Sequence, residues 1–199
     1  AASGDRINGL NAARNVFYKG SVAKTIVESS AKVGGILSLE DLANYKSEFG
    51  EPVSTTFEGH EIFGHDSWTQ GPMLQQTLNL LEHFDLKAMG HNSPEYIHTV
   101  SEALKLVFGD REAYYADPNY AEVPIDGLLS KEYAAERVGL IDPERALPEQ
   151  AAPGDPWKYS NGVGAVPATK VIAASGNGVS DSSSHEGTTH VSVLDDQGN

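Results

Sequence analysis

The sequence contains no cysteine, only two methionines and few aromatic residues. Without thiols it can form neither disulfides nor thiolate metal sites, and its compartment stays open. No apolar run approaches the length of a membrane-spanning helix. Basic residues are also scarce, with 14 Lys and Arg against 28 Asp and Glu and a formal net charge of -14. This charge argues against binding to nucleic acid or to an anionic membrane surface.

What is present suits a globular protein. A chain of 199 residues is long enough to bury a core as a single domain. Its first five residues are Ala-Ala-Ser-Gly-Asp, with neither a Met nor an apolar segment, so no signal peptide is expected in this stretch. A mature or excised segment of a longer protein would look the same.

Apolar spacing and capping signals predict a helix-rich first part with short strands. The leucines at 74, 78 and 81 are expected to form one buried helix face, and Ala103, Leu104, Val107 and Phe108 another. A glycine pair at 34–35 ends the first helical unit, and Glu58-Gly59 forms the turn of a hairpin. Helices are expected over residues 11–33 with a break at Gly20, 38–45, 72–84, 94–115 and 130–137, and hairpin strands over 53–57 and 60–63. Ser38, with the acidic Asp41 three residues later, is expected to cap the second of these helices.

Beyond residue 140 the composition changes. Residues 141–187 are rich in Pro, Gly and Ser, and such a stretch buries too little surface to offset the entropy of ordering it. We expect a long, mobile connection on the surface. Residues 189–194 then alternate as a strand does, and 196–199 predict the turn of a hairpin whose second strand is absent.

Two histidine patterns could suggest a metal site. A zinc-protease helix needs His at positions i and i+4, whereas His190 follows His185 at i+5 among glycine and β-branched threonines. His60, His65 and Asp66 lie at a strand end with no helical geometry behind them. The sequence therefore predicts no metal and no cofactor.

Thr188 is the candidate nucleophile. A threonine hydroxyl needs an adjacent base, and threonine hydrolases supply one by making the nucleophile the first residue of a chain, whose own α-amine accepts the proton. The α-amine titrates near pH 8. To create it, the hydroxyl attacks the preceding carbonyl and an N-to-O acyl shift gives an ester that water releases. Gly187 suits this step because it lets the backbone bend and leaves the carbonyl unhindered.

Five segments in order along the chain carry a recognisable pattern. The most specific is Thr-Thr-His-Val-Ser-Val-Leu-Asp, followed by Gly198-Asn199, and the others contain Phe-Tyr-Lys-Gly, Gly-Gly followed by Glu-Asp-Leu, Leu-Asn-Leu-Leu-Glu and Asp-Arg-Glu-Ala-Tyr. Together they resemble the γ-glutamyltranspeptidase family of N-terminal nucleophile hydrolases. The segments are residues 17–23, 34–45, 78–82, 110–118 and 188–195.

The resemblance implies an α+β fold, part of an αββα sandwich. Residues 1–140 would belong to the large subunit, 141–187 to a linker and 188–199 to the first strand of the small subunit. Thr188 would be both the self-processing residue and the catalytic nucleophile, and the Gly187–Thr188 bond would be cut. The substrate would be a γ-glutamyl amide such as glutathione, and the remainder of the small subunit a partner. This family also suggests a periplasmic or other extracytoplasmic location.

No substrate-binding residue is carried over, because the family's arginine lies upstream and its other binding groups downstream of this stretch. We therefore expect the 199-residue chain alone to be inactive and to self-associate through exposed apolar surface.

One segment departs from the family pattern. At residues 65–72 typical transpeptidases have a proline-rich Ser-Ser-Gly-Gly loop, whereas this chain has His-Asp-Ser-Trp-Thr-Gln-Gly-Pro. That segment is more similar to transpeptidase-like amidohydrolases, so an amidohydrolase of other small amides stays open. A non-catalytic homologue, in which Thr188 is only a strand residue, is the other alternative. We expect Trp68 to be a packed aromatic lid without a substrate role.

Overall fold

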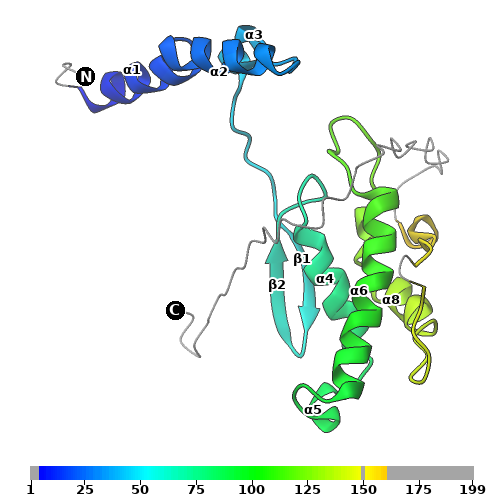
Figure 1. The fold of residues 1–199 in the computed structure, drawn as a ribbon. Coiled ribbons are helices and arrows are strands. Elements are labelled where there is room, and N and C mark those ends of the chain that lie inside the picture. The colour runs from blue at the N-terminus through cyan, green and yellow to red at the C-terminus, as the bar shows by residue number, and fades with distance from the viewer. Residues whose placement is uncertain (1–4, 149–150, 161–199) are drawn as a thin grey trace. The chain divides into compact units, whose positions relative to one another are not determined.

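The computed structural model describes residues 5–148 and 151–160. The chain divides between Glu51 and Pro52 into two compact units, called unit 1 (residues 1–51) and unit 2 (residues 52–199). The elements of both are labelled in Figure 1. No helix in the described part of the chain combines the length and the apolar character needed to cross a bilayer.

Unit 1 consists of three helices, α1 (Arg6–Tyr18), α2 (Ser21–Lys32) and α3 (Leu39–Asn44). The first begins earlier than the apolar spacing predicts, because the Asp5 side chain caps it by accepting a hydrogen bond from the backbone N–H of Ile7. The predicted break at Gly20 is confirmed. A Cβ at this position would lie 2.8 Å from the carbonyl oxygen of Val16, so the corner between α1 and α2 requires glycine.

The predicted capping box is present at the start of α3. The Ser38 hydroxyl accepts from the Asp41 backbone N–H, and the Asp41 carboxylate accepts from the Ser38 backbone N–H. The Ser38 hydroxyl also donates to the Asp41 carboxylate at 2.7 Å, and this bond, together with the one from the Ser38 backbone N–H, holds the pKa of Asp41 below its usual value. Among residues 5–51, however, only Ala23 is buried, so the apolar residues of these helices remain largely exposed within the unit.

Unit 2 opens with the predicted β-hairpin, β1 (Val53–Phe57) and β2 (His60–Gly64). The strands are antiparallel, with Val53 opposite Gly64 and Phe57 opposite His60. Glu58 and Gly59, the two turn residues, both have positive φ, at 48° and 80°. A two-residue turn of this kind matches the twist of the strands, which explains the register.

The hairpin, α6 and α8 of unit 2 pack against one central helix. That helix, α4, lies between the hairpin on one side and α6 and α8 on the other (Figure 1). Its residues and those of α6 and α8 supply most of an apolar core that includes Leu80, Leu81, Leu106 and Val107. The elements are α4 (Gly71–Leu81), α5 (Leu86–Met89), α6 (Pro94–Tyr114), α7 (Ile125–Leu128), α8 (Lys131–Val138) and the 3-10 helix η1 (Pro156–Tyr159).

The prediction of which residues of α4 and α6 face the core is partly wrong. Leu74 is 60% exposed, while Gln75, Gln76 and Asn79 are buried. Because α4 has neighbours on both sides, its polar side chains satisfy groups of those neighbours: the Gln75 amide donates to the carbonyls of Val53 and Ile62. On α6, Ala103 and Val107 are buried as expected, whereas Leu104 and Phe108 are exposed.

The described beginning of the expected linker packs against the rest of unit 2. Ala151 and Pro156 are buried, and the backbone at Ala151 passes so close to α6 that a Cβ at Gly109 would overlap its carbonyl oxygen. The backbone at Pro156 approaches Gly127 of α7 in the same way. Residues 151–156 are therefore held to the helices and do not form a loose surface connection.

Candidate functional site

The predicted cleavage site, Gly187 and Thr188, lies outside the described residues. His185, Glu186 and His190 lie outside them as well. The predicted strand over residues 189–194 and the cleavage site therefore stay predictions.

The residues first weighed as metal ligands lie near one another in the sequence but form no ligand cluster. His60 begins β2 opposite Phe57, and the His65 ring lies 6.0 Å from the ring of Trp68. Within residues 5–148 and 151–160, no three His, Asp or Glu side chains gather closely enough to hold a metal ion.

A hollow of about 440 Å³ lies between the loop that precedes α4 and the end of α6. Its walls come from residues 67–70 on one side and from Arg111 and residues 115–117 on the other. The hydroxyl of the buried Ser67 joins the two walls by donating to the carbonyl of Ala116 at 3.0 Å. This volume is within the range of small-molecule sites.

Trp68 lies on this hollow and is 62% exposed. The expectation that it is a packed aromatic is therefore wrong. The reason is the neighbouring residue: the side chain of Ser67 takes the buried position and makes the long-range hydrogen bond to Ala116 that fixes the loop. The indole is left at the surface, in contact distance of a molecule entering the hollow.

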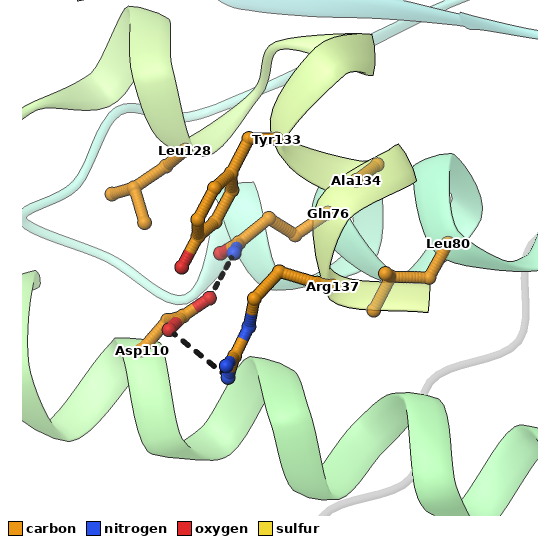
Figure 2. Close-up of a pocket in the computed structure, with 7 residues that line it drawn as sticks. All are labelled: Gln76, Leu80, Asp110, Leu128, Tyr133, Ala134 and Arg137. Atoms are coloured by element: carbon orange, nitrogen blue, oxygen red, sulfur yellow. Dashed lines mark hydrogen bonds and ion pairs between the residues drawn. The ribbon is translucent and has the colours of Figure 1, made fainter. Parts of the chain in front are cut away.

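A second feature is a cluster of buried polar side chains from three helices. Asp110 of α6, Gln76 of α4 and Arg137 of α8 point toward one another, with Tyr133 beside them (Figure 2). The Asp110 carboxylate accepts from the Gln76 amide at 2.9 Å and lies 3.4 Å from the Arg137 guanidinium. It also accepts from the Gly154 backbone N–H at 2.9 Å.

The cluster fixes the segment that follows residue 150. Arg137 donates to the carbonyl of Ala152 at 2.8 Å, and the Tyr114 hydroxyl donates to the carbonyl of Gly154 at 2.7 Å. Burial outweighs the neighbouring Arg137 and raises the pKa of Asp110. The cavity among these side chains measures about 10 Å³, which is the size of one water molecule. The cluster is thus a structural junction, too tightly packed to admit a substrate.

A matching junction lies nearer the start of α6. Glu102, 1% exposed, accepts from Lys105 at 2.8 Å and from the Leu147 backbone N–H. Burial would raise the pKa of this carboxyl, but the hydrogen bonds from Lys105 and Leu147 outweigh it and the pKa is lowered. Two buried carboxylates on one helix therefore attach two stretches of the following chain.

Sequence reasoning assigned no role to either junction. Asp110 appeared only within a motif, and Glu102 not at all. One signal was available, since a helix whose inward face carries Glu102 and Asp110 among apolar residues must pair these charges inside the protein. The identity of the partners could not be read from the sequence, because Arg137 and Gly154 lie 27 and 44 residues further on.

Comparison with known proteins identifies the family of this chain. The sequence model of the Gamma-glutamyltranspeptidase family matches residues 6–199. The chain is therefore a member of a known enzyme family, and it belongs to the gamma-glutamyltranspeptidase family. This confirms the resemblance read from the five sequence segments, and the helix-rich structure with two short strands is consistent with an α+β fold.

Among similar proteins, Acylase ACY 1 proenzyme of Pseudomonas sp. (strain SE83) is 37% identical over 133 residues, covering 66% of this chain and 24% of that protein. Glutathione hydrolase-like YwrD proenzyme of Bacillus subtilis (strain 168) is 35% identical over 171 residues, covering 84% and 30%. The structure of Helicobacter pylori gamma-Glutamyltranspeptidase matches with a TM-score of 0.66 and 32% identity, covering 76% of this chain and 44% of that chain. The chain thus spans less than a third of the length of these two curated relatives.

Proposed function

We propose that the protein containing this chain is a γ-glutamyltranspeptidase-like proenzyme that cuts its own Gly187–Thr188 bond and then acts on amides through Thr188. The observation that supports this is the family match over residues 6–199, which includes both residues. Two similar relatives are themselves named proenzymes. The chain would contribute the end of the large-subunit region and the first strand of the small subunit in an αββα sandwich.

Self-cleavage would begin with attack of the Thr188 hydroxyl oxygen on the carbonyl carbon of Gly187. The bond between this carbon and the Thr188 nitrogen breaks, the nitrogen takes up a proton, and an ester joins Gly187 to the threonine oxygen. Water then hydrolyses the ester, leaving a carboxylate on Gly187 and a free α-amine on Thr188. That amine is the base which the hydroxyl lacked before cleavage.

Turnover would use the same hydroxyl on a second carbonyl. The α-amine accepts the hydroxyl proton, the oxygen attacks the γ-glutamyl carbonyl, and the amine of the substrate leaves with a proton. The γ-glutamyl group is then held as an ester of Thr188. Water releases glutamate and an acceptor amine releases a new γ-glutamyl amide, so hydrolysis and transfer share one intermediate.

The test is turnover of a γ-glutamyl anilide by the purified full-length protein. We expect Thr188→Ala to lower the rate by at least about a thousandfold, because no other group replaces a deleted nucleophile. Thr188→Ser should retain measurable activity, since it keeps the hydroxyl. Thr56→Ala, the same substitution at an exposed strand position, is the control and should turn over normally. Full activity of Thr188→Ala would refute the proposal, and an inactive wild type would favour the non-catalytic homologue.

A second candidate is an amidohydrolase of other acyl groups. It is favoured by the 37% identity to a protein named an acylase and by the segment at residues 65–72. The two candidates differ in whether the α-amino group of the acyl donor is needed. Faster turnover of a glutaryl anilide, which lacks that group, than of a γ-glutamyl anilide would select the acylase, and the reverse order would select the transpeptidase.

A further inference from the structure

We propose that the hollow between residues 67–70 and the end of α6 binds a small carboxylate that carries an aromatic or other flat group. The cation of this site is Arg111 and the stacking surface is Trp68, both of which line the hollow. The proposal concerns binding alone and does not require Thr188 to be a nucleophile.

The guanidinium of Arg111 can accept a new partner. One of its nitrogens lies 3.4 Å from the carboxylate of Glu112, and its carbon lies 5.4 Å from the centre of the Phe108 ring. Glu112 and Phe108 are both exposed, and an ion pair between exposed neighbours holds its members weakly. A guanidinium has five N–H donors in a planar fork that fits a carboxylate. In a chain with a net charge of -14, this cation at the edge of a hollow is a specific attraction for an anion.

The loop that carries Trp68 is held in one shape. The backbone N–H and the hydroxyl of Thr69 both donate to the carbonyl of Asp66, and the same hydroxyl accepts from the Gly71 backbone N–H at 3.0 Å. Gly71 lies so close to the backbone of His65 that no Cβ fits there. The indole is therefore exposed on a pre-formed loop, so a ligand would not have to order it, which favours binding.

The opposite wall is fixed as well. Tyr115 donates its hydroxyl hydrogen to the Gln76 side-chain oxygen at 2.8 Å, and burial raises the pKa of this hydroxyl, so it stays protonated. Ser67 joins that wall to the Trp68 loop. The hydroxyls of Ser67, Thr69 and Tyr115 are thus used in holding the walls, and Arg111 is the one cation among the residues that line the hollow.

We expect the ligand to carry a single negative charge. Asp117 also lines the hollow and is exposed, and its negative charge repels a dianion more strongly than a monoanion. A carboxylate therefore suits the site better than a phosphate monoester. The indole adds an offset-stacking surface for a ring attached to that carboxylate.

The experiment measures binding of phenylacetate by fluorescence. The 199-residue chain has two tryptophans, Trp68 and Trp157, so the Trp157→Phe variant of this chain leaves Trp68 as the reporter. We expect phenylacetate to change its emission with a Kd of about 1 mM, as for other ligands of this size. Phenylacetamide, which has the ring without the charge, and acetate, which has the charge without the ring, should each bind at least about fivefold more weakly.

Substitutions of Arg111 test whether its charge causes the preference for phenylacetate. Arg111→Gln should abolish the preference for phenylacetate over phenylacetamide, and Arg111→Lys should restore part of it because the charge returns. Arg145→Gln removes the same charge from an exposed position elsewhere in unit 2 and should leave the preference unchanged. No emission change with phenylacetate, equal binding of phenylacetamide, or tighter binding of phenyl phosphate would each overturn the proposal, whatever the outcome of the Thr188 assays.

Discussion

Both units of this chain contain helices, but the helices of unit 1 bury far less surface than those of unit 2. In the described part of unit 1 a single residue, Ala23, is buried, and its helices are held by local contacts such as the stacking of Tyr18 on Tyr45. Unit 2 encloses an apolar core around α4 and two buried carboxylates on α6. In unit 2, α4 enters the core because its neighbours cover both its apolar and its polar inward positions, and no comparable cover exists within the described part of unit 1.

The largest expected effect comes from breaking the Asp110 junction. Arg137→Met leaves the Asp110 carboxylate buried without its cation, which should lower the free energy of unfolding of unit 2 by about 3 kcal/mol or more. Both tryptophans of the 199-residue chain lie in unit 2, so urea unfolding of this chain followed by fluorescence measures that unit. Arg145→Met, at an exposed position, is the control and should change stability by less than about 0.5 kcal/mol. A similar small change for Arg137→Met would mean that the junction is dispensable.

The next largest expected effect comes from replacing one large apolar side chain by alanine in each unit. Leu106→Ala, at a position 1% exposed in the core of unit 2, should cost about 3 kcal/mol because it leaves a cavity. Phe17→Ala, at a position 46% exposed in unit 1, removes more atoms but should change the unfolding of unit 2 by less than about 0.5 kcal/mol. The same urea titration measures both. Comparable losses would show that unit 1 belongs to the folding unit of the core.

The smallest expected effect is a difference in how Glu102 and Asp110, the two buried carboxylates of α6, make the free energy of unfolding depend on pH. The folded-state pKa of Glu102 is lowered, so its stabilising contribution is present above its usual pKa and is lost as the pH falls through the folded value. The pKa of Asp110 is raised, so its contribution is present at low pH and is lost as the pH rises through the folded value.

Unfolding curves of Glu102→Gln and Asp110→Asn, each measured from about pH 3 to pH 8 beside the wild type, check these signs. The destabilisation caused by Glu102→Gln should grow with pH, and the one caused by Asp110→Asn should shrink. If the destabilisation changed with pH in the same direction in both variants, the opposite pKa shifts of Glu102 and Asp110 would be contradicted.

Local signals in the sequence predicted much of the fold. The hairpin turn at Glu58-Gly59, the break at Gly20 and the cap at Ser38 each depend on a few neighbouring residues, and each is confirmed. The burial of Gln76 and the exposure of Leu74 were not predictable, because they depend on which elements pack on both sides of α4.

The candidate site shows the same limit. The exposed position of Trp68 depends on the contact of Ser67 with Ala116, 49 residues away, which no local pattern contains. The family resemblance rested on short ordered segments and is confirmed by the family match, whereas the role of Thr188 rests on a motif outside the described residues.

The most direct test of the proposed function is the intact mass of the full-length protein after purification and long incubation. We predict two chains, one ending at Gly187 and one beginning at Thr188, with Thr188→Ala remaining a single uncut chain under the same conditions. A wild-type protein that stays uncut, or a cut at another bond, would contradict the assignment of Thr188 as the self-processing nucleophile.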